Sequence, residues 1–370
     1  NNLNNLDRKV VIIVKGGPGT GKSAIALQLL GYALKEGYSA VHITNSSAFT
    51  TTIKGIILNK LNFSRNKLNG LFKLSHNFIK AKKNSFDIAI CDEAHRFRKS
   101  TNFRWLRSGE SQIYQIIFAS KLSVFFVDEN QIVRPGEDGR IEHIKEQARR
   151  LNADVYEYEL EVQFRYMGNE NFVKWLDCIL DLTNEFIDPK NWQEHFEFKI
   201  FERIEYMEKE LQDKINKGYT GRIVAGFVWP WNNPHKDGAL PLDIKINNWM
   251  KPWNKKRPPG KILNPQNDPY YEWATRKQNP LSEVGCIYSV QGFEFDYIGV
   301  IWGNDLVIRN NEWVAYPNNS QDPLICGKAP KDVLTLLKNT YRVLLSRGMR
   351  GCYVYFLDKE TKEFFKKHFC

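Results

Sequence analysis

The sequence contains no run of apolar residues as long as the ~18 that a membrane-spanning helix needs, so it predicts no membrane span. Its beginning, Asn1 to Asn5, is polar and has neither the basic nor the apolar region of a secretory signal peptide. An initiator methionine is also missing, which we interpret as a domain cut from a longer protein or a processed product. The six cysteines are scattered without a C-x-x-C pair. This spacing argues against zinc and against a disulfide framework, and it favours a reducing, cytoplasmic setting.

The composition bounds the size and charge of the fold. The chain has 370 residues, of which 42% are hydrophobic and 26% charged, enough for two domains of ordinary size. The formal net charge is +11. Such an excess of Lys and Arg suits a polyanionic partner such as nucleic acid, although it also serves solubility alone.

Short apolar runs rich in β-branched residues alternate with helical patterns along the chain. The expected strands are Val10–Val14, Ala40–Thr44, Phe86–Cys91, Leu122–Val127, Val155–Leu160, Arg222–Val228, Val284–Tyr288, Tyr297–Trp302 and Cys352–Leu357. The expected helices are Ser23–Lys35, Ile141–Leu151, Phe172–Leu180 and a charged one within 201–217. This alternation predicts an α/β fold with parallel sheets and right-handed crossovers.

A phosphate-binding loop is the most specific motif. The pattern G-x-x-x-x-G-K-[ST] is matched by Gly16, Gly17, Pro18, Gly19, Thr20, Gly21, Lys22 and Ser23. It follows an apolar strand and opens a helix, as the motif requires. The glycines let backbone N–H groups face one phosphate, Lys22 reaches the β- and γ-phosphates, and the Ser23 hydroxyl binds Mg²⁺. The loop predicts a nucleoside triphosphatase.

Acidic residues follow the third expected strand. Asp92 is the expected Mg²⁺ ligand, and Glu93 beside it is expected to activate the attacking water. The alternative is an acidic cap on the next helix. Gln131 follows the fourth strand and is the candidate sensor of the γ-phosphate, although this stretch could also be a polar turn.

These motifs resemble those of superfamily 1 helicases and occur in the same order. Lys22, the DEAH sequence at 92–95 and Gln131 correspond to motifs I, II and III. Later stretches look like motifs IV, V and VI: Gln163–Arg165, Tyr288–Glu294 and Tyr341–Gly348. The sequence from Val284 to Ile301 is most similar to the bacterial Schlafen-helicase-like domain, a branch of that superfamily, and the resemblance covers roughly residues 10–358.

The resemblance implies two RecA-like P-loop lobes with ATP between them. The first lobe is expected over residues 1–160. The second is expected over residues 161–370, with a Trp- and Pro-rich insertion at about 229–278. Arg165 and Arg347 are then expected to reach the γ-phosphate. The other expected nucleotide contacts of the second lobe are Gln291, Gly292, Glu294 and Arg342.

Thr44, Asn45 and Ser46 look like motif Ia, which in the family touches the backbone of a single strand. Small hydroxyl and amide groups suit phosphate contacts, but a polar turn that caps a helix is an equal alternative. The tryptophans of the insertion, interleaved with Lys and Arg, could stack bases, or they could form a small core under a long loop.

Two departures from the family pattern bear on function. Superfamily 1 enzymes usually carry a glutamine upstream of motif I that reads adenine, and no glutamine precedes Gly16. The gap from Asp92 to Asp128 is also short and leaves little room for the large accessory subdomain that processive helicases insert there.

The sequence therefore predicts an ATP- and Mg²⁺-dependent translocase or helicase-like motor on single-stranded DNA or RNA. One alternative is a switch in which ATP and nucleic acid gate a fused or associated effector, such as a nuclease, without unwinding. A nucleotide kinase or other P-loop transferase is the weaker rival, because motifs V and VI have no role there.

Overall fold

The computed structural model describes residues 8–46, 50, 53–54, 57, 64–103, 106–160, 171–258 and 267–369, with the backbone alone for 101–103 and 106–108. The chain divides into two compact units. The first contains Asn1–Ile132 and Gly136–Phe164, and the second contains Val133–Pro135 and Arg165–Cys370.

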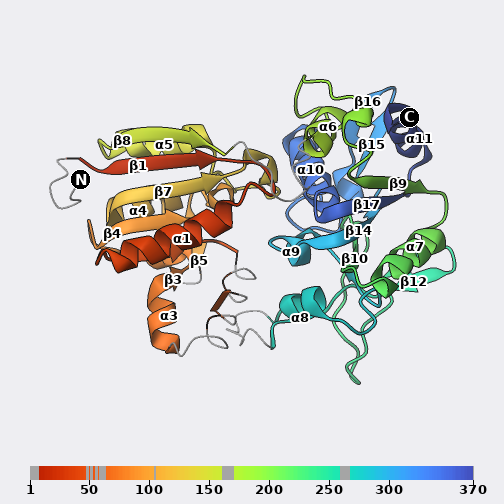
Figure 1. Ribbon diagram of the computed structural model, residues 1–370, viewed down its shortest axis with the longest axis horizontal. Helices are drawn as coiled ribbons and strands as arrows, with labels where there is room; N and C mark the ends of the chain where they lie inside the picture. The colour runs from red at the N-terminus through yellow and green to blue at the C-terminus, as the bar shows by residue number, and fades with distance from the viewer. Residues whose placement is uncertain are drawn as a thin grey trace. The chain divides into compact units, whose positions relative to one another are not determined.

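The first unit is built on a parallel sheet with the strand order β3-β2-β4-β7-β1-β8 (Figure 1). Its strands are β1 (Val10–Lys15), β2 (Ala40–Ile43), β3 (Phe72–Lys73), β4 (Phe86–Cys91), β7 (Ser120–Val127) and β8 (Asp154–Glu159). A small antiparallel hairpin, β5 (Thr101–Phe103) and β6 (Leu106–Ser108), stands apart from it. Polar residues that follow β1, β4 and β7 therefore meet at the carboxyl edge of one sheet, where α/β folds place their ligands.

Helices cover both faces of this sheet. On one face, α1 (Lys22–Lys35) and α3 (Arg65–Leu71) pack against apolar side chains of β1, β4 and β7. On the other face lie α4 (Gln112–Ala119) and α5 (Ile141–Arg150). Short 3₁₀ turns complete the unit: η2 (Ser75–Phe78), η3 (Ala94–Arg96) and η4 (Glu129–Gln131).

The second unit contains another parallel sheet, with the order β13-β10-β14-β17-β9. Its strands are β9 (Glu197–Phe201), β10 (Gly221–Ala225), β13 (Val284–Gly285), β14 (Phe295–Trp302) and β17 (Gly348–Phe356). The α/β class with parallel sheets is thus confirmed in both units. Strand β9 escaped the sequence reading because its apolar residues alternate with charged ones at an edge position.

The helices of the second unit also lie on both faces of its sheet. One face packs against α6 (Asn171–Ile179), α10 (Pro330–Leu345) and α11 (Lys359–Phe369), together with the hairpin β15 (Leu306–Arg309) and β16 (Glu312–Ala315). The other face packs against α7 (Ile204–Asn216) and part of the 229–278 stretch. The remaining short elements are η5 (Pro189–Asn191), α9 (Ile287–Val290) and η7 (Pro317–Asn319).

The expected strand Val284–Tyr288 is wrong beyond Gly285. The chain turns there into α9, and the Ser289 hydroxyl accepts a hydrogen bond from the backbone N–H of Cys286 at 2.9 Å. This local bond offers the backbone an alternative to the sheet ladder.

The 229–278 stretch forms a small core of its own. It contains β11 (Ile244–Ile246), β12 (Trp249–Lys251) and α8 (Pro269–Thr275). Trp253 is 1% exposed and donates its indole N–H to the Pro230 carbonyl, while Trp249 donates to Glu208. Of the two interpretations left open by the sequence, the structure favours the core for these two rings.

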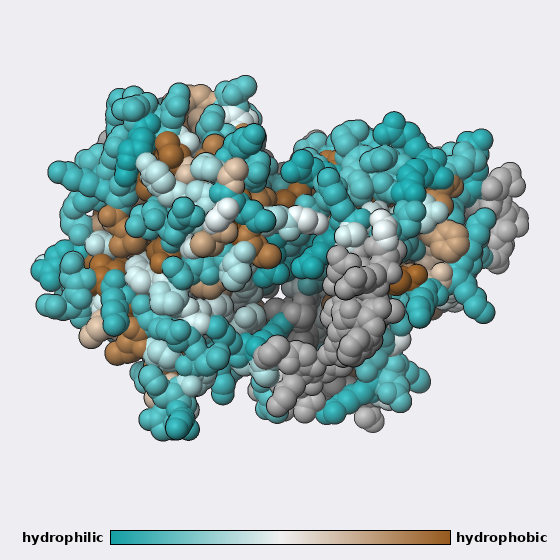
Figure 2. Space-filling view, turned by 180° about the vertical axis from the view of Figure 1, so that it is seen from behind, coloured by the Kyte–Doolittle hydropathy of each residue, from teal (hydrophilic) through white to brown (hydrophobic). Residues whose placement is uncertain are grey.

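The surface of each unit is mainly polar. Hydrophilic side chains cover most of the visible face of each unit, and apolar ones gather in small clusters between them (Figure 2). Among the described residues, no helix is both long and apolar enough to cross a membrane.

Candidate functional site

The phosphate-binding loop connects β1 to α1 in the first unit. Gly19 and Gly21 adopt φ of 83° and 80°, in the left-handed region that favours glycine. A Cβ on Gly16 would lie 2.5 Å from the Thr20 hydroxyl, so this position has no room for a side chain. Gly21 also offers no side chain to cap α1. The first N–H groups of α1 and the positive end of its dipole face the loop, because the helix begins there. Both features favour an anion at this position.

Lys22 is buried within this loop, with 6% of its surface exposed. Its ammonium donates to the carbonyl oxygens of Gly16 and Gly17, both at 2.6 Å. The loop backbone thus fixes the cation beside the N-terminus of α1, where the sequence predicted a phosphate contact.

Asp92 lies at the carboxyl end of β4 and is fully buried. Its carboxylate accepts a hydrogen bond from the backbone N–H of Glu93, and the Ser23 hydroxyl lies near enough to act on its pKa. Burial and the nearby Glu93 charge raise the pKa of Asp92 to about 6, although Ser23, the Glu93 N–H and Lys22 oppose the shift. The structure therefore brings together Ser23 and Asp92, the two predicted Mg²⁺ ligands.

The chemistry of these two side chains fits Mg²⁺. Both offer hard oxygen atoms, which this ion prefers, and Mg²⁺ sites beside phosphates use few protein ligands. A cation at Asp92 would also relieve the cost of burying its charge. No cluster of three or more His, Cys, Asp or Glu side chains with metal-binding geometry occurs among the described residues.

Glu93 adopts a left-handed backbone conformation, with φ of 53°, immediately after β4. Its carboxylate lies 3.1 Å from Nε2 of His95, which is itself fully buried. Desolvation raises the pKa of Glu93, but the nearby His95, Lys22 and Arg96 outweigh it and hold the pKa well below its usual value. Glu93 is therefore an ionised carboxylate with a fixed orientation.

Two histidines near the carboxylates were missed as site residues by the sequence analysis. His95 contacts Glu93, and Nε2 of His42 lies 3.8 Å from Asp92. Burial lowers the pKa of His42 to about 4, so this ring is neutral at pH 7. In the sequence, these two site residues are visible only as a histidine two positions after Glu93 and as a second histidine inside an apolar strand.

Gln131 lies in η4 after β7 and is 5% exposed. Its side-chain amide donates to the Asp128 carboxylate at 2.8 Å, and Asp128 also accepts from the N–H of Asn130. The polar-turn alternative describes this local geometry. The role of Gln131 as a phosphate sensor stays a prediction.

Thr44, Asn45 and Ser46 follow β2, and their polar groups contact the protein itself. The Asn45 amide donates to the Arg96 carbonyl at 3.0 Å and to Gln112 at 2.9 Å. Thr44 accepts from the N–H of Ser46, and both residues are nearly inaccessible. These contacts are those of the polar turn. The predicted nucleic-acid contact at these residues remains a prediction.

Motifs V and VI meet within the second unit, where α9 contacts α10. Gln291 ends α9 and is buried, Gly292 has φ of 92°, and Glu294 is exposed. The backbone N–H of Phe295 donates to the carbonyl of Arg347 and so joins the ends of the two motifs.

The two arginines of motif VI are buried in this unit. Arg342 makes a two-pronged ion pair with Asp177 of α6. Arg347 donates to the Val343 carbonyl at 3.0 Å and approaches the Ser346 hydroxyl at 3.5 Å. Their predicted roles at a nucleotide stay predictions. Arg165 of motif IV lies outside the described residues.

A family model decides the classification of the chain. The model of the Schlafen group 3 DNA/RNA helicase domain matches residues 9–358. The chain belongs to this family. The resemblance drawn from motifs I to VI is thereby confirmed, and this Schlafen group 3 domain is a helicase-like P-loop protein.

The domain is also similar to a Saccharomyces cerevisiae protein with the name Uncharacterized protein YPL245W. The two are 24% identical over 394 residues, which cover 95% of this chain and 83% of the yeast protein.

Solved helicase structures resemble the domain more distantly. The Pif1 helicase of Candida albicans has a TM-score of 0.38 at 12% identity, covering 97% of this chain and 95% of that one. The Hef helicase domain of Pyrococcus furiosus has a TM-score of 0.34 at 8% identity, covering 99% and 96%. Scores this low carry no argument about function.

Proposed function

We propose that this domain is an ATP-dependent translocase or helicase-like motor on nucleic acid. The observation that carries the proposal is the contact between Ser23 and Asp92 beside the buried ammonium of Lys22. Lys22 and Ser23 begin α1, and Asp92 follows β4, 69 residues after Ser23 in the chain. Their meeting supplies a cation, a hydroxyl and a carboxylate at a helix N-terminus, as Mg²⁺-assisted hydrolysis of a triphosphate requires.

The residues of the first unit divide the work. Lys22 and the N–H groups of the loop bind the phosphates, while Ser23 and Asp92 hold Mg²⁺. The bound Mg²⁺ would supply Lewis-acid neutralisation of the charge that develops on the phosphates. Glu93 orients the attacking water and accepts its proton, and His95 keeps the Glu93 carboxylate in one orientation.

Three further side chains complete the proposed chemistry. Gln131, fixed by Asp128, detects the γ-phosphate. Arg165 and Arg347 are the additional cations that we propose to stabilise the negative charge of the γ-phosphoryl group during its transfer. The net charge of +11 and the membership of a DNA/RNA helicase domain family support nucleic acid as the partner.

ATP turnover of the whole chain, with and without single-stranded DNA or RNA, tests the proposal. Glu93→Gln should bind ATP normally and lose turnover about 100-fold, in the range of general-base removal. Glu36→Gln, an exposed carboxylate at the end of α1, is the matched control and should leave both unchanged.

The outcomes of this experiment distinguish the nucleic-acid motor from the ATP- and nucleic-acid-gated switch. Strand-stimulated turnover with displacement of a labelled duplex supports the motor. Stimulated turnover without displacement supports instead the ATP- and nucleic-acid-gated switch. Turnover that ignores every nucleic acid contradicts both.

A further inference from the structure

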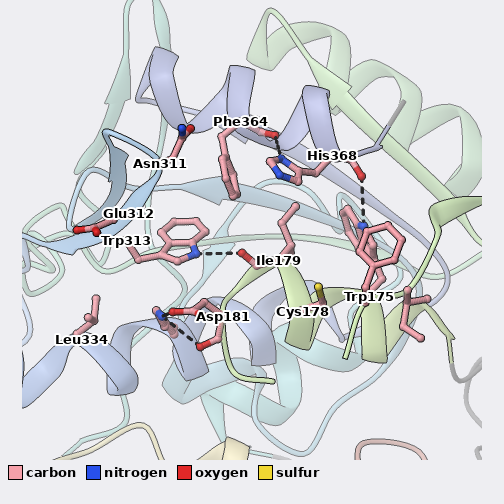
Figure 3. A pocket seen from close by; sticks show the side chains of 13 residues that line it. Trp175, Cys178, Ile179, Asp181, Asn311, Glu312, Trp313, Leu334, Phe364 and His368 are labelled. Carbon is pink, nitrogen blue, oxygen red and sulfur yellow. Dashed lines mark hydrogen bonds and ion pairs between the residues drawn. The ribbon is translucent and has the colours of Figure 1, made fainter. Parts of the chain in front are cut away.

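A cavity of about 680 Å³ opens on the second unit. It lies among α6, α10, α11 and the β15–β16 hairpin, and an irregular segment over residues 181–188 forms part of its rim. None of its lining residues belongs to motifs I to VI. Figure 3 shows Trp313, Phe364 and Ile179 pointing into the same space from three different elements.

The walls of this pocket are apolar and fixed. Trp313 donates its indole N–H to the Ile179 carbonyl at 2.9 Å, and Trp175 donates to the His368 carbonyl at 3.4 Å. Because both indole N–H groups are used within the unit, the rings present carbon surface to the cavity. Such prearranged aromatic walls suit an apolar side chain, since little ordering is needed on binding.

One side chain at the rim is unusually exposed. Phe186 is 75% exposed, more than any other large apolar side chain among the described residues. An exposed aromatic ring beside an aromatic pocket is the arrangement of a protein-binding surface, because aromatic residues contribute most to such interfaces.

The rim is acidic although the whole chain is basic. The Asp181 side chain is 76% exposed, and Glu312 and Asn311 are also exposed. Between 181 and 188 the sequence contains three acidic residues and no Lys or Arg. Of the basic side chains that line the pocket, Lys338 is only 7% exposed and is bound to Asp181 at 2.9 Å, and the ring of His368 contacts the Phe364 carbonyl at 2.8 Å.

This charge pattern decides the class of ligand. Carboxylates at the rim repel a phosphate backbone, so the pocket is unsuited to nucleic acid. They attract Lys and Arg, and complementary charges at a rim steer and select partners. The apolar interior requires a large apolar group between those charges.

We propose that this pocket is a docking site for a segment of a partner protein in which a large apolar side chain is flanked by Lys or Arg. The apolar side chain enters between Trp313, Phe364 and Ile179, and Phe186 closes over it. The flanking cations lie against Asp181 and Glu312.

Selection of a random dodecapeptide library displayed on phage, with the whole chain as bait, tests the site. Enriched peptides should share a large apolar residue next to Lys or Arg. A synthetic copy of the most enriched peptide, labelled with a fluorophore, then gives a dissociation constant by anisotropy. Acidic consensus peptides, or no enrichment over bare support, would overturn the proposal.

Two variants at the rim locate the binding. Phe186→Ala and Glu312→Lys change exposed side chains and should each weaken the peptide at least about tenfold, as loss of an interface anchor or reversal of a rim charge does. Tyr32→Ala and Glu36→Lys make the same kinds of change on α1 of the first unit and should bind like the wild type. Equal weakening in all four variants, or in none, contradicts the site.

Two free cysteines give an independent readout. Cys178 lines the pocket, whereas Cys326 is exposed elsewhere on the same unit. Saturating peptide should slow alkylation of Cys178, measured by mass spectrometry, and leave Cys326 unaffected. An unchanged rate at Cys178 places the peptide outside the pocket and overturns the proposal.

Discussion

The two units use buried charge in different ways. In the first unit, the ends of parallel strands bring together Lys22, Asp92 and Glu93. Among the described residues, no two of these three side chains form an ion pair with each other. In the second unit, Arg342 is neutralised by Asp177 on a neighbouring helix. The first arrangement gathers charged side chains at the phosphate-binding loop, and the second uses charge to join two helices.

A second ion pair lies along the contact between α6 and α10 in the second unit. Asp181 pairs with Lys338 about one turn away from the pair of Asp177 and Arg342. Asp177 belongs to α6 and Asp181 lies two residues beyond its end, so two ion pairs connect α6 and the segment after it to α10, which contains the start of motif VI. A motif residue such as Arg342 can therefore have a structural role that its position in the sequence does not reveal.

The largest effect is expected from Asp177→Ala, which leaves the Arg342 guanidinium without its carboxylate. Breaking a buried ion pair by removing one partner costs about 3–5 kcal/mol, and urea unfolding should show this loss. Asp154→Ala is the control, because its pair with Arg8 is exposed and should contribute less than about 1 kcal/mol. A loss of stability below about 1 kcal/mol for Asp177→Ala would show that the ion pair of Arg342 does not stabilise the fold. The contrast between the two units would then be wrong.

Lys22→Ala should act on chemistry and not on folding. Removing a preorganised donor to developing charge costs about 100- to 1000-fold in rate, or about 2.7–4 kcal/mol, measured as steady-state ATP turnover. Lys35→Ala, at the exposed other end of α1, should retain wild-type turnover. If both variants behave alike, the phosphate loop is not the site of hydrolysis.

Asp305→Asn tests a buried carboxylate that serves only the fold of the second unit. Burial raises the pKa of Asp305 to about 6, even though Tyr341 donates to it at 2.5 Å. A group with a raised carboxyl pKa stabilises the fold at low pH, so the wild type should lose about 3 kcal/mol as the pH rises from about 4 through 6.

The asparagine variant removes this titration and keeps an acceptor for Tyr341. Its stability relative to the wild type, measured in urea, should therefore increase between about pH 4 and 7. Asp237→Asn makes the same substitution at an exposed position and is the matched control. A flat profile for Asp305→Asn would show that its carboxyl titrates normally.

Two serines of the first unit provide the smallest and most selective comparison. Ser111 accepts from the N–H of Tyr114 and caps α4, so Ser111→Ala should cost about 1 kcal/mol of stability and leave ATP affinity intact. Ser23→Ala should do the reverse, with weaker Mg²⁺-dependent binding and little change in unfolding. Identical behaviour of the two variants would mean that Ser23 is a structural residue.

Much of the first unit was predictable because its signals are local. The apolar runs before Gly16 and Asp92 indicate strands, and parallel strands bring their carboxyl ends together. The contacts of Glu93 with His95 and of Gln131 with Asp128 depend on turn geometry after the strand. A pattern of residue types does not fix that geometry.

The second unit was less predictable because its decisive contacts are distant in sequence. Asp177 and Arg342 are 165 positions apart, and Trp313 donates to a carbonyl 134 positions away. The tryptophans of the insertion show the same limit, because a Trp–Lys pattern is compatible with a stacking surface and with a core. Only the bonds of Trp249 and Trp253 distinguish the two.

The affinity for ATP, measured by calorimetry with and without Mg²⁺, tests the central claim most directly, because that claim assigns phosphate and metal to different residues of the first unit. In the wild type Mg²⁺ should strengthen binding. Lys22→Ala should weaken binding under both conditions, whereas Asp92→Asn should lose only the part that depends on Mg²⁺. An Asp92→Asn protein that responds to Mg²⁺ like the wild type would contradict the account.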